Sequence, residues 1–182
     1  EREARLARLD ERRVAVITGA GAGIGKAIAR RLAADGDLVV VTDRHEGRLS
    51  EVVDEIHVSG GTAVGVRLDI ESRSDFDEVL AAVEHDHGPV GIYIWNAALN
   101  KQQPIFEHDP ELFDRIAYAN INNCWYSCKI VAEQMRRRGG GSIVMIGSIA
   151  PDVPATDREP PYAMSKAACR ALVGGIAAAG GP

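Results

Sequence analysis

Residues 13–32 read RVAVITGAGAGIGKAIARRL, and this stretch decides the fold. A short apolar strand at 14–17 leads into a loop with glycine at positions 19, 21, 23 and 25, and an amphipathic helix follows. Glycine lets a backbone turn sharply and approach a pyrophosphate, while the start of the next helix offers unpaired N–H groups to an anion. The stretch therefore predicts the first half of a βαβ unit that holds a phosphate.

The glycine spacing is T-G-x-x-x-G-x-G, because Ile24 stands where a strict G-x-G-x-x-G counted from Gly19 needs its third glycine. A glycine-rich turn alone would equally suit a plain connection between two elements. Its position between an apolar strand and an amphipathic helix favours a dinucleotide site. The residues expected to contact the cofactor here are Thr18, Gly19, Gly21, Gly23, Ile24 and Gly25.

Composition limits the class of protein. The chain has 182 residues, 46% of them hydrophobic and 26% charged, which is ordinary for one soluble globular domain. The net charge of −5 argues against a nucleic-acid partner, and the three arginines at 136–138 suit the end of a predicted helix. No apolar run is long enough to span a membrane, and the N-terminus lacks a signal-peptide core.

The cysteines indicate a reduced, cytoplasmic setting, because there are three of them with no framework spacing. Cys124 and Cys128 lie four residues apart on one predicted helix face, but no histidine or third cysteine stands nearby in the sequence to complete a zinc set. Buried thiols and no metal site are expected.

Strands and helices alternate along the chain. Further strands are predicted at 38–42, 62–68, 90–95 and 142–146. Helices are predicted at 46–59, from Ser72 to the stop at Gly88, from Asp109 to about Arg138, and from Tyr162 onward. Residues 1–12 are a charged surface lead-in. This alternation predicts a doubly wound parallel α/β sheet, Rossmann-like, in a single domain over residues 1–182.

Polar residues stand at the predicted strand ends, where ligands of such sheets bind: Thr18, Asp43, Asp69, Asn96 and Ser148. Asp43 follows Gly25 by 18 residues, where a carboxylate accepts hydrogen bonds from ribose hydroxyls and repels a 2′-phosphate. NAD is therefore favoured over NADP, although Arg44 could pair with a phosphate. Asp69 either faces the adenine or caps its strand.

Tyr162 and Lys166 form Y-x-x-x-K, which places both side chains on one face of a helix start. A free tyrosine titrates near pH ~10, so a cation must stabilise its phenolate before it can exchange protons at neutral pH. Lys166 supplies that cation and could also reach the nicotinamide ribose. Ser148 can donate a hydrogen bond to a substrate oxygen beside the tyrosine.

From about residue 10 to its end, the sequence resembles the short-chain dehydrogenase/reductases with the T-G-x-x-x-G-x-G loop. The resemblance rests on the glycine loop and on Asp69-Ile70, Asn96-Ala97, Asn120, Ser148 and Tyr162-Ala-Met-Ser-Lys166. It implies that Ser148, Tyr162 and Lys166 are catalytic, with Tyr162 as base in oxidation and acid in reduction. It further implies that Asn120 anchors a water linking Lys166 to solvent, and that Ile70, Asn96, Ala97, Tyr162 and Lys166 bind the cofactor.

Two departures from the family pattern stand out. Its Asn-Asn-Ala-Gly turn reads Trp95-Asn96-Ala97-Ala98 here, which brings a bulky ring and an extra methyl near the cofactor site. Family members also continue past the last helix with a strand, a substrate-covering loop, a helix and an edge strand. The sequence stops at Pro182, so we expect a C-terminally truncated chain that lacks the substrate lid.

The leading hypothesis is an NAD(H)-dependent dehydrogenase of a secondary alcohol, or a reductase of its ketone. Gln102, Gln103 and the polar residues 152–159 suggest a polar, sugar-acid or polyol substrate, and the loop around Ser148 is similar to gluconate-type dehydrogenases. An NADP-dependent 3-oxoacyl reductase is the alternative within the family. An NAD-binding module without turnover is the alternative outside it. The last two helices carry small and apolar residues beyond what one sheet face can cover, and the family resemblance implies that such helices pair with their copies in a homodimer or homotetramer.

Overall fold

The structure is a computed structural model that describes residues 12–153 and 157–180. Of the expected surface lead-in, residues 1–11 lie outside the described residues. The described part contains one sheet of five strands in the order β3-β2-β1-β4-β5, and every pair is parallel. This confirms the predicted doubly wound α/β sheet in its Rossmann-like form.

The strands are β1 (Val14–Thr18), β2 (Leu38–Asp43), β3 (Thr62–Arg67), β4 (Val90–Trp95) and β5 (Ser142–Met145). Every residue of β1 and β4 is buried, which is why both read as continuous apolar runs instead of alternating ones. The outer strands β3 and β5 are only partly covered. β1 lies at the centre, where the strand order reverses direction.

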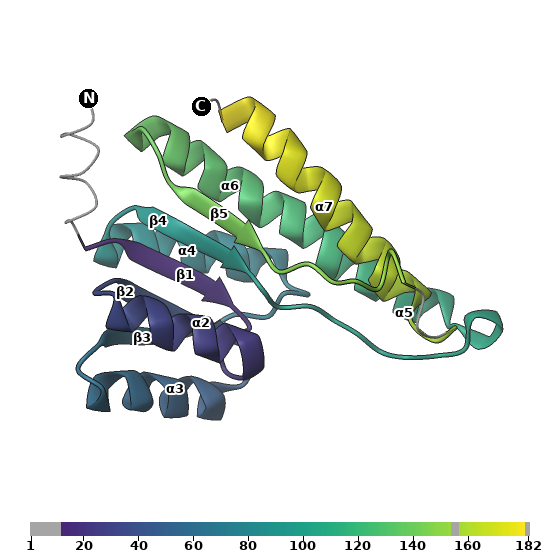
Figure 1. Cartoon of the computed structure of the whole chain (residues 1–182), viewed down its shortest axis with the longest axis horizontal. Helices are drawn as coiled ribbons and strands as arrows, with labels where there is room; N and C mark the ends of the chain where they lie inside the picture. Colours follow the sequence, from purple (N-terminus) through teal and green to yellow (C-terminus); the bar gives the residue numbers. More distant parts are fainter. Residues whose placement is uncertain (1–11, 154–156, 181–182) are drawn as a thin grey trace.

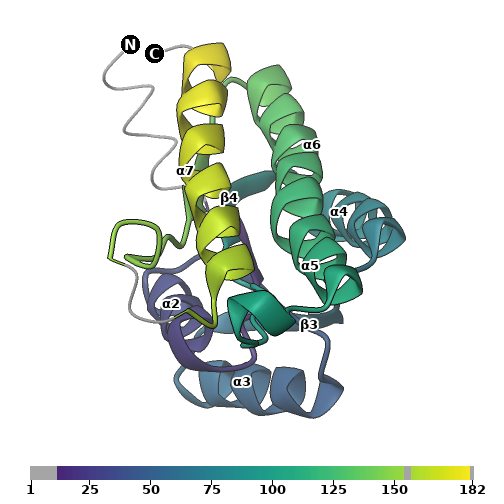
Figure 2. The same ribbon diagram turned by 90° about the vertical axis from the view of Figure 1, so that its right-hand side faces the viewer.

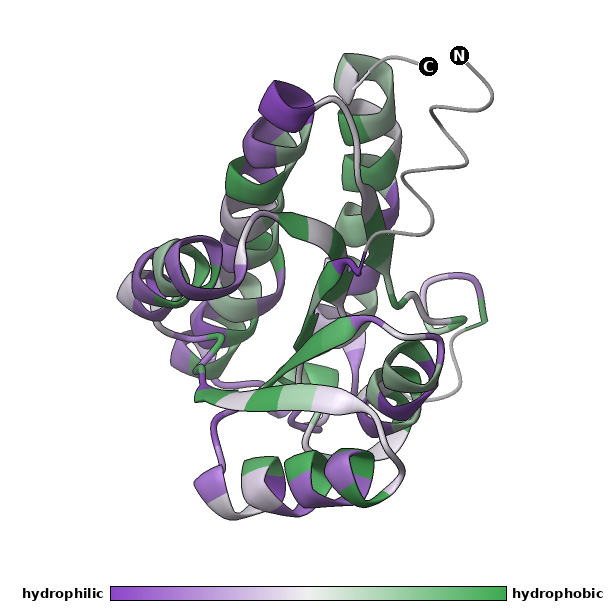
Figure 3. Cartoon of the chain, turned by 90° about the vertical axis from the view of Figure 1, so that its left-hand side faces the viewer, coloured by the Kyte–Doolittle hydropathy of each residue, from purple (hydrophilic) through white to green (hydrophobic). Residues whose placement is uncertain are grey.

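Helices cover both faces of the sheet (Figures 1 and 2). The helices α2 (Gly23–Ala34) and α3 (Glu46–Val58) pack on one face, in the core cluster that includes Ile17, Val41 and Ile56. The helices α4 (Arg73–His87), α6 (Asn123–Arg138) and α7 (Pro160–Gly180) pack on the other. Figure 3 shows apolar residues along the central strands and polar residues on the outward sides of the surrounding helices. No helix of the described residues is long and apolar enough to cross a bilayer.

The long helix predicted from Asp109 to Arg138 is not one continuous α-helix. It consists of α5 (Pro110–Ala117), a π-helical turn, η2 (Tyr118–Asn122), and α6. Asp109 caps the start, accepting a hydrogen bond from the N–H of Glu111 at 2.9 Å. The connection between β4 and α5 also contains a short 3₁₀ turn, η1 (Ile105–Glu107).

The last helix begins at Pro160 and not at the predicted Tyr162. Two prolines fit its first turn because the N–H groups there have no partner inside the helix. Other boundaries differ by one or two residues: β1 and β2 continue to Thr18 and Asp43, while β5 ends at Met145.

The aromatic contact between α4 and β4 fixes one half of the core. Phe76 and Trp95 are both fully buried, with ring centroids 5.8 Å apart. Trp95, which departs from the family turn, therefore packs inward beneath the sheet edge. Replacing a buried phenylalanine with alanine removes apolar contacts and leaves a cavity.

Phe76→Ala should lower the free energy of unfolding by about 3–5 kcal/mol, measured by urea denaturation. Phe106→Ala is the matched control, because Phe106 is 99% exposed in η1. The control should change stability by less than about 0.5 kcal/mol. Equal losses in the two variants would contradict the assignment of Phe76 to the core.

Candidate functional site

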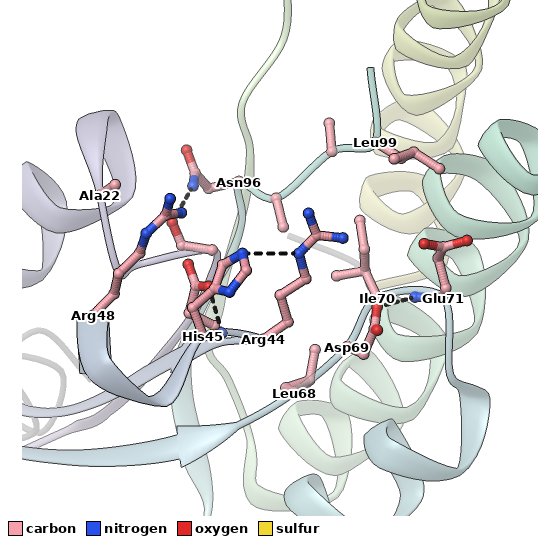
Figure 4. A pocket seen from close by; sticks show the side chains of 14 residues that line it. Ala22, Arg44, His45, Arg48, Leu68, Asp69, Ile70, Glu71, Asn96 and Leu99 are labelled. Carbon is pink, nitrogen blue, oxygen red and sulfur yellow. Dashed lines mark hydrogen bonds between the residues drawn. The ribbon is translucent and has the colours of Figure 1, made fainter. Parts of the chain in front are cut away.

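A cavity of about 310 Å³ lies at the carboxyl edge of the sheet, where the loops after β1, β2, β3 and β4 meet (Figure 4). This is the edge at which parallel α/β sheets bind ligands. The cavity is lined by Gly19, Ala22, Asp43, Arg44, His45, Arg48, Leu68, Asp69, Ile70, Glu71, Asn96, Ala97, Ala98 and Leu99. Six of these are residues that the sequence predicted to bind the cofactor: Gly19, Asp43, Asp69, Ile70, Asn96 and Ala97.

The glycine loop is shaped by close backbone approach. Gly19 and Gly23 have φ values of +64° and +55°, in the left-handed region that favours glycine. A Cβ on Gly25 would lie 2.5 Å from the carbonyl oxygen of Gly19, and one on Gly21 would lie 2.7 Å from Asp43 Oδ2. Packing therefore requires these two glycines, while Ile24, also predicted at the cofactor, is 62% exposed.

The helix that follows the loop starts without a side-chain cap. Its N-cap residue is Ala22, which has no side chain able to accept a hydrogen bond and which lines the cavity. No acidic residue stands in the first turn of α2. The first N–H groups and the positive end of the helix dipole are thus available to an anion at the cavity.

Thr18 and Asn96 join the loops after β1 and β4. The buried Thr18 hydroxyl accepts hydrogen bonds from the N–H groups of Asn96 (3.0 Å) and Ala97 (3.1 Å). In return, Asn96 Nδ2 donates to the carbonyl oxygens of Thr18 (3.0 Å) and Gly19 (3.1 Å). The Thr18 hydroxyl and the Asn96 amide nitrogen thus support the loop that lines the cavity.

Charges of both signs surround the predicted ribose position. Asp43 Oδ1 accepts a hydrogen bond from the N–H of His45 at 3.0 Å, which orients the carboxylate at the end of β2. Arg44 Nε lies 3.2 Å from His45 Nε2, and Arg48 projects into the same cavity from α3 (Figure 4). The sequence interpretation missed Arg48. Arg44 lies in the loop before α3, so the four-residue spacing of the two arginines does not place them on one helix face.

Asp69 has partners within its own turn. Its Oδ1 accepts from the N–H of Glu71 at 3.0 Å, and its N–H donates to Asp75 Oδ2 at 2.9 Å. The carboxylate therefore caps the turn after β3 and at the same time lines the cavity. The two roles that the sequence left open for Asp69 are compatible.

Tyr162 and Lys166 lie together at the start of α7. Lys166 Nζ is 5.7 Å from the centroid of the Tyr162 ring and donates a 2.7 Å hydrogen bond to the carbonyl oxygen of Ile146, just after β5. Burial lowers the pKa of Lys166, and the neighbouring thiols of Cys169 and Cys124 oppose this shift. Ser148, two residues beyond Ile146, accepts a hydrogen bond from the N–H of Ala150 at 3.1 Å.

Asn120 connects the β4 loop to the same helix. Its side chain exchanges two 2.8 Å hydrogen bonds with the backbone N–H and C=O of Leu99, and Nδ2 also donates to Ser165 Oγ at 3.1 Å. Ser165 Oγ donates in turn to the carbonyl oxygen of Tyr162 at 2.7 Å. The structure thus places Asn120 in a chain of contacts that ends at the backbone of Tyr162.

These features define an α/β domain with a dinucleotide-type loop at its ligand edge. The family model for the short chain dehydrogenases matches residues 13–182. The chain belongs to the short-chain dehydrogenase family.

Relatives of known name agree with this assignment. The chain is 33% identical over 171 residues to dehydrogenase/reductase SDR family member 4 of Sus scrofa, covering 92% of this chain and 60% of the relative. It is 37% identical over 163 residues to 7alpha-hydroxysteroid dehydrogenase of Escherichia coli K12, covering 90% and 63%. The chain therefore spans about three fifths of the length of these curated relatives.

Solved structures show the same fold. A metagenomic short-chain oxidoreductase in complex with NADP superposes with a TM-score of 0.87 at 30% identity, covering 92% of this chain and 76% of that one. A gluconate 5-dehydrogenase from Burkholderia cenocepacia J2315, in complex with NADP and tartrate, gives 0.84 at 28% identity, covering 96% and 69%. The likeness extends over nearly all of the chain.

Thr18→Val should lower the free energy of unfolding by about 1–3 kcal/mol, because it keeps the shape of the side chain but leaves two backbone N–H groups without their acceptor. Thr42→Val is the control: the Thr42 hydroxyl only donates, to the carbonyl oxygen of Ile17 at 2.9 Å. We expect a smaller loss there, again by urea denaturation. Equal losses would show that the Thr18 hydroxyl does not hold the two loops together.

Proposed function

We propose that the protein is an oxidoreductase that transfers a hydride between NAD(H) and a secondary alcohol or its ketone. The observation that carries the proposal is the pairing of Tyr162 with the buried Lys166 at the start of α7. The family to which the chain belongs and the uncapped start of α2 beside the cavity support it.

The cavity residues fit a dinucleotide. The uncapped start of α2, with Ala22 in the cavity wall, offers N–H groups to a pyrophosphate. Asp43 would receive the adenosine ribose, with Asp69 and Ile70 on the adenine side of the cavity. When bound, the nicotinamide ring supplies the hydride acceptor or donor.

The side chains of the protein then handle the proton and the substrate oxygen. Tyr162 accepts the hydroxyl proton of an alcohol or returns it to a ketone oxygen. Lys166 places its positive charge 5.7 Å from the centroid of the Tyr162 ring, beside the group that exchanges the proton. Ser148 donates a hydrogen bond to the same substrate oxygen. Asn120 orients the start of α7 through Ser165 and so helps to fix Tyr162.

A polar secondary alcohol, of the polyol or sugar-acid kind, is the substrate class we favour. Gln102 and Gln103 follow the β4 loop, and the backbone N–H of Gln103 donates to the carbonyl oxygen of Arg158 at 3.0 Å. This contact brings polar residues of both flanking loops together ahead of Tyr162. The similarity to a gluconate 5-dehydrogenase structure supports the same class.

We also infer that the protein acts as a homodimer or homotetramer in the cytoplasm. Apolar side chains on α6 and α7 are exposed to solvent: Trp125 is 49% exposed and Val173 is 45% exposed. A second copy of these helices would cover them. The three cysteines are free thiols, as expected in a reducing compartment.

Purified protein should reduce NAD⁺ in the presence of secondary alcohols, followed as NADH absorbance. Tyr162→Phe should lower kcat by about 10²–10⁴-fold, because it removes the group that exchanges the proton. Cofactor affinity, measured by fluorescence titration, should persist in the variant. Tyr118→Phe, which changes a tyrosine on η2 that is 39% exposed, is the matched control and should keep full activity.

Cofactor binding without NADH formation in the wild type would contradict the proposed enzymatic activity and indicate a module that binds the cofactor without turnover. Turnover that survives Tyr162→Phe would contradict the role of this residue.

The preference for NAD⁺ over NADP⁺ should depend on the Asp43 carboxylate. The wild type should bind NAD⁺ more tightly than NADP⁺, and Asp43→Ala should bring the two affinities closer by removing the charge that repels a 2′-phosphate. Arg44→Ala and Arg48→Ala are the opposing variants. If NADP⁺ binds more tightly to the wild type and either arginine variant abolishes that preference, the arginines pair with the phosphate and the choice of NAD is wrong.

A further inference from the structure

A second buried amide lies one helical turn after Asn120. Asn123 is the first residue of α6 and is 0% exposed. Its Nδ2 donates a 2.8 Å hydrogen bond to the carbonyl oxygen of Ile70, which stands 53 residues earlier in the chain. Burying an amide is unfavourable unless its polar atoms are paired, so its contacts fix where Asn123 lies. The proposed transfer of hydride and proton gives this side chain no role.

The Asn123 amide is held in one orientation. Its Oδ1 accepts a hydrogen bond from Arg73 Nε at 3.5 Å, and a guanidinium can only donate. The oxygen of the amide must therefore face Arg73, which leaves the nitrogen to face the Ile70 carbonyl. The Arg73 guanidinium itself lies over two aromatic rings, 4.5 Å from the centroid of Tyr126 and 5.6 Å from that of Tyr118. These contacts determine that Asn123 is the donor to Ile70.

Asn120 and Asn123 hold two different walls of the candidate cofactor cavity. Asn120 binds the backbone of Leu99 after β4, whereas Asn123 binds the backbone of Ile70 after β3. Both Leu99 and Ile70 line the cavity of about 310 Å³. The two amides therefore act on the same cavity from one helical turn.

The sheet does not join these two walls directly. In the strand order β3-β2-β1-β4-β5, two other strands separate β3 from β4. The long helical segment bridges this gap, because Asn120 and Asn123 stand three residues apart, where η2 passes into α6. The spacing of the loops after β3 and β4 is thus fixed from this segment.

The turn after β3 also has contacts that do not involve α6. Asp69 Oδ1 accepts a hydrogen bond from the N–H of Glu71 at 3.0 Å, which fixes the shape of the turn. Arg115 of α5 binds Glu71 with two hydrogen bonds of 2.8 and 3.0 Å, but the Arg115 side chain is 54% exposed. An ion pair that water reaches contributes little to stability, so the buried hydrogen bond from Asn123 is the stronger tether of this turn.

We propose that Asn123 is a positioning residue for the dinucleotide. It holds the Ile70 carbonyl and so fixes the wall that receives the adenine half of the cofactor. The inference rests on the proposed function, in which Asp69 and Ile70 lie on the adenine side of the cavity. A wall that is already ordered costs less free energy on binding than one that the ligand must order, so Asn123 increases cofactor affinity. The contact lies inside the fold, and association through α6 and α7 leaves it unchanged.

Two variants of Asn123 remove this hydrogen bond. Asn123→Asp keeps the size of the side chain and an oxygen toward Arg73, but it presents a second oxygen, instead of an N–H, to the Ile70 carbonyl. Asn123→Ala removes both contacts. Gln134→Ala is the matched control, because Gln134 is a buried amide of α6 whose Nε2 donates to Glu84 of α4 at 2.8 Å, and neither residue lines the cavity.

The test measures the dissociation constants of NAD⁺, NADP⁺ and ADP-ribose for the full chain by isothermal titration calorimetry. ADP-ribose contains the adenosine and the pyrophosphate but no nicotinamide, so it reports on the adenine half. In both Asn123 variants, we expect the Kd of ADP-ribose and that of the preferred dinucleotide to rise by the same factor, about 3–10-fold. Gln134→Ala should lose stability to urea as the Asn123 variants do, but should keep each Kd within about twofold of the wild type.

The outcomes separate this inference from the proposed function. If the folded wild type binds none of the three ligands, both are wrong. If it binds them and the Asn123 variants bind equally well, the inference is wrong and the proposed function stands. An equal loss of affinity in Gln134→Ala would also overturn the inference, because the effect would then be general destabilisation. Far-ultraviolet circular dichroism establishes that each variant is folded, and Asn123→Asp decides where the alanine variant is not.

Discussion

The junction between the loops after β1 and β4 is the constraint on which the candidate site depends. The strand order reverses at β1, so the crevices on its two sides open toward different helices. Thr18 and Asn96 close this point with four hydrogen bonds between 3.0 and 3.1 Å. Without that closure, the glycine loop would not be held against the neighbouring backbone, and the cavity would lose one wall.

A second line of contacts leads from the same junction to α7, the helix that carries Tyr162 and Lys166. Leu99, three residues beyond Asn96, is held by Asn120, and Asn120 is held by Ser165. The loop after β4 and the start of α7 are thus joined through the buried side-chain amide of Asn120.

Local pattern made most of the fold predictable. Continuous apolar runs predicted the central strands, and prolines and glycines predicted the helix ends to within one or two residues. The cavity residues Asp43, Asp69 and Asn96 were predictable because strand ends of a parallel sheet gather at one edge. The position of Arg48 in the cavity wall could not be predicted, because it depends on how α3 is rotated about its axis against its neighbours.

The hydrogen-bond partner of Lys166 could not be predicted from the sequence either. The hydrogen bond to the carbonyl oxygen of Ile146 depends on how closely α7 approaches the end of β5, and no local pattern fixes that distance. The resemblance predicted a water-linked role for the neighbouring Asn120. The described contacts of its side chain are with Leu99 and Ser165.

The π-helical turn has a consequence for the rotational phase of the long helical segment. Buried positions recur there in steps of four, at Leu112, Ile116, Asn120, Cys124 and Cys128. In an ideal α-helix each such step overshoots a full turn by about 40°, so four steps would drift by about 160° and carry the last residue to the opposite side. The wider turn at 118–122 absorbs part of this drift. The amide of Asn120, which holds the loop after β4, and the thiol of Cys124, which contacts Cys169 of α7, therefore share one continuous buried seam.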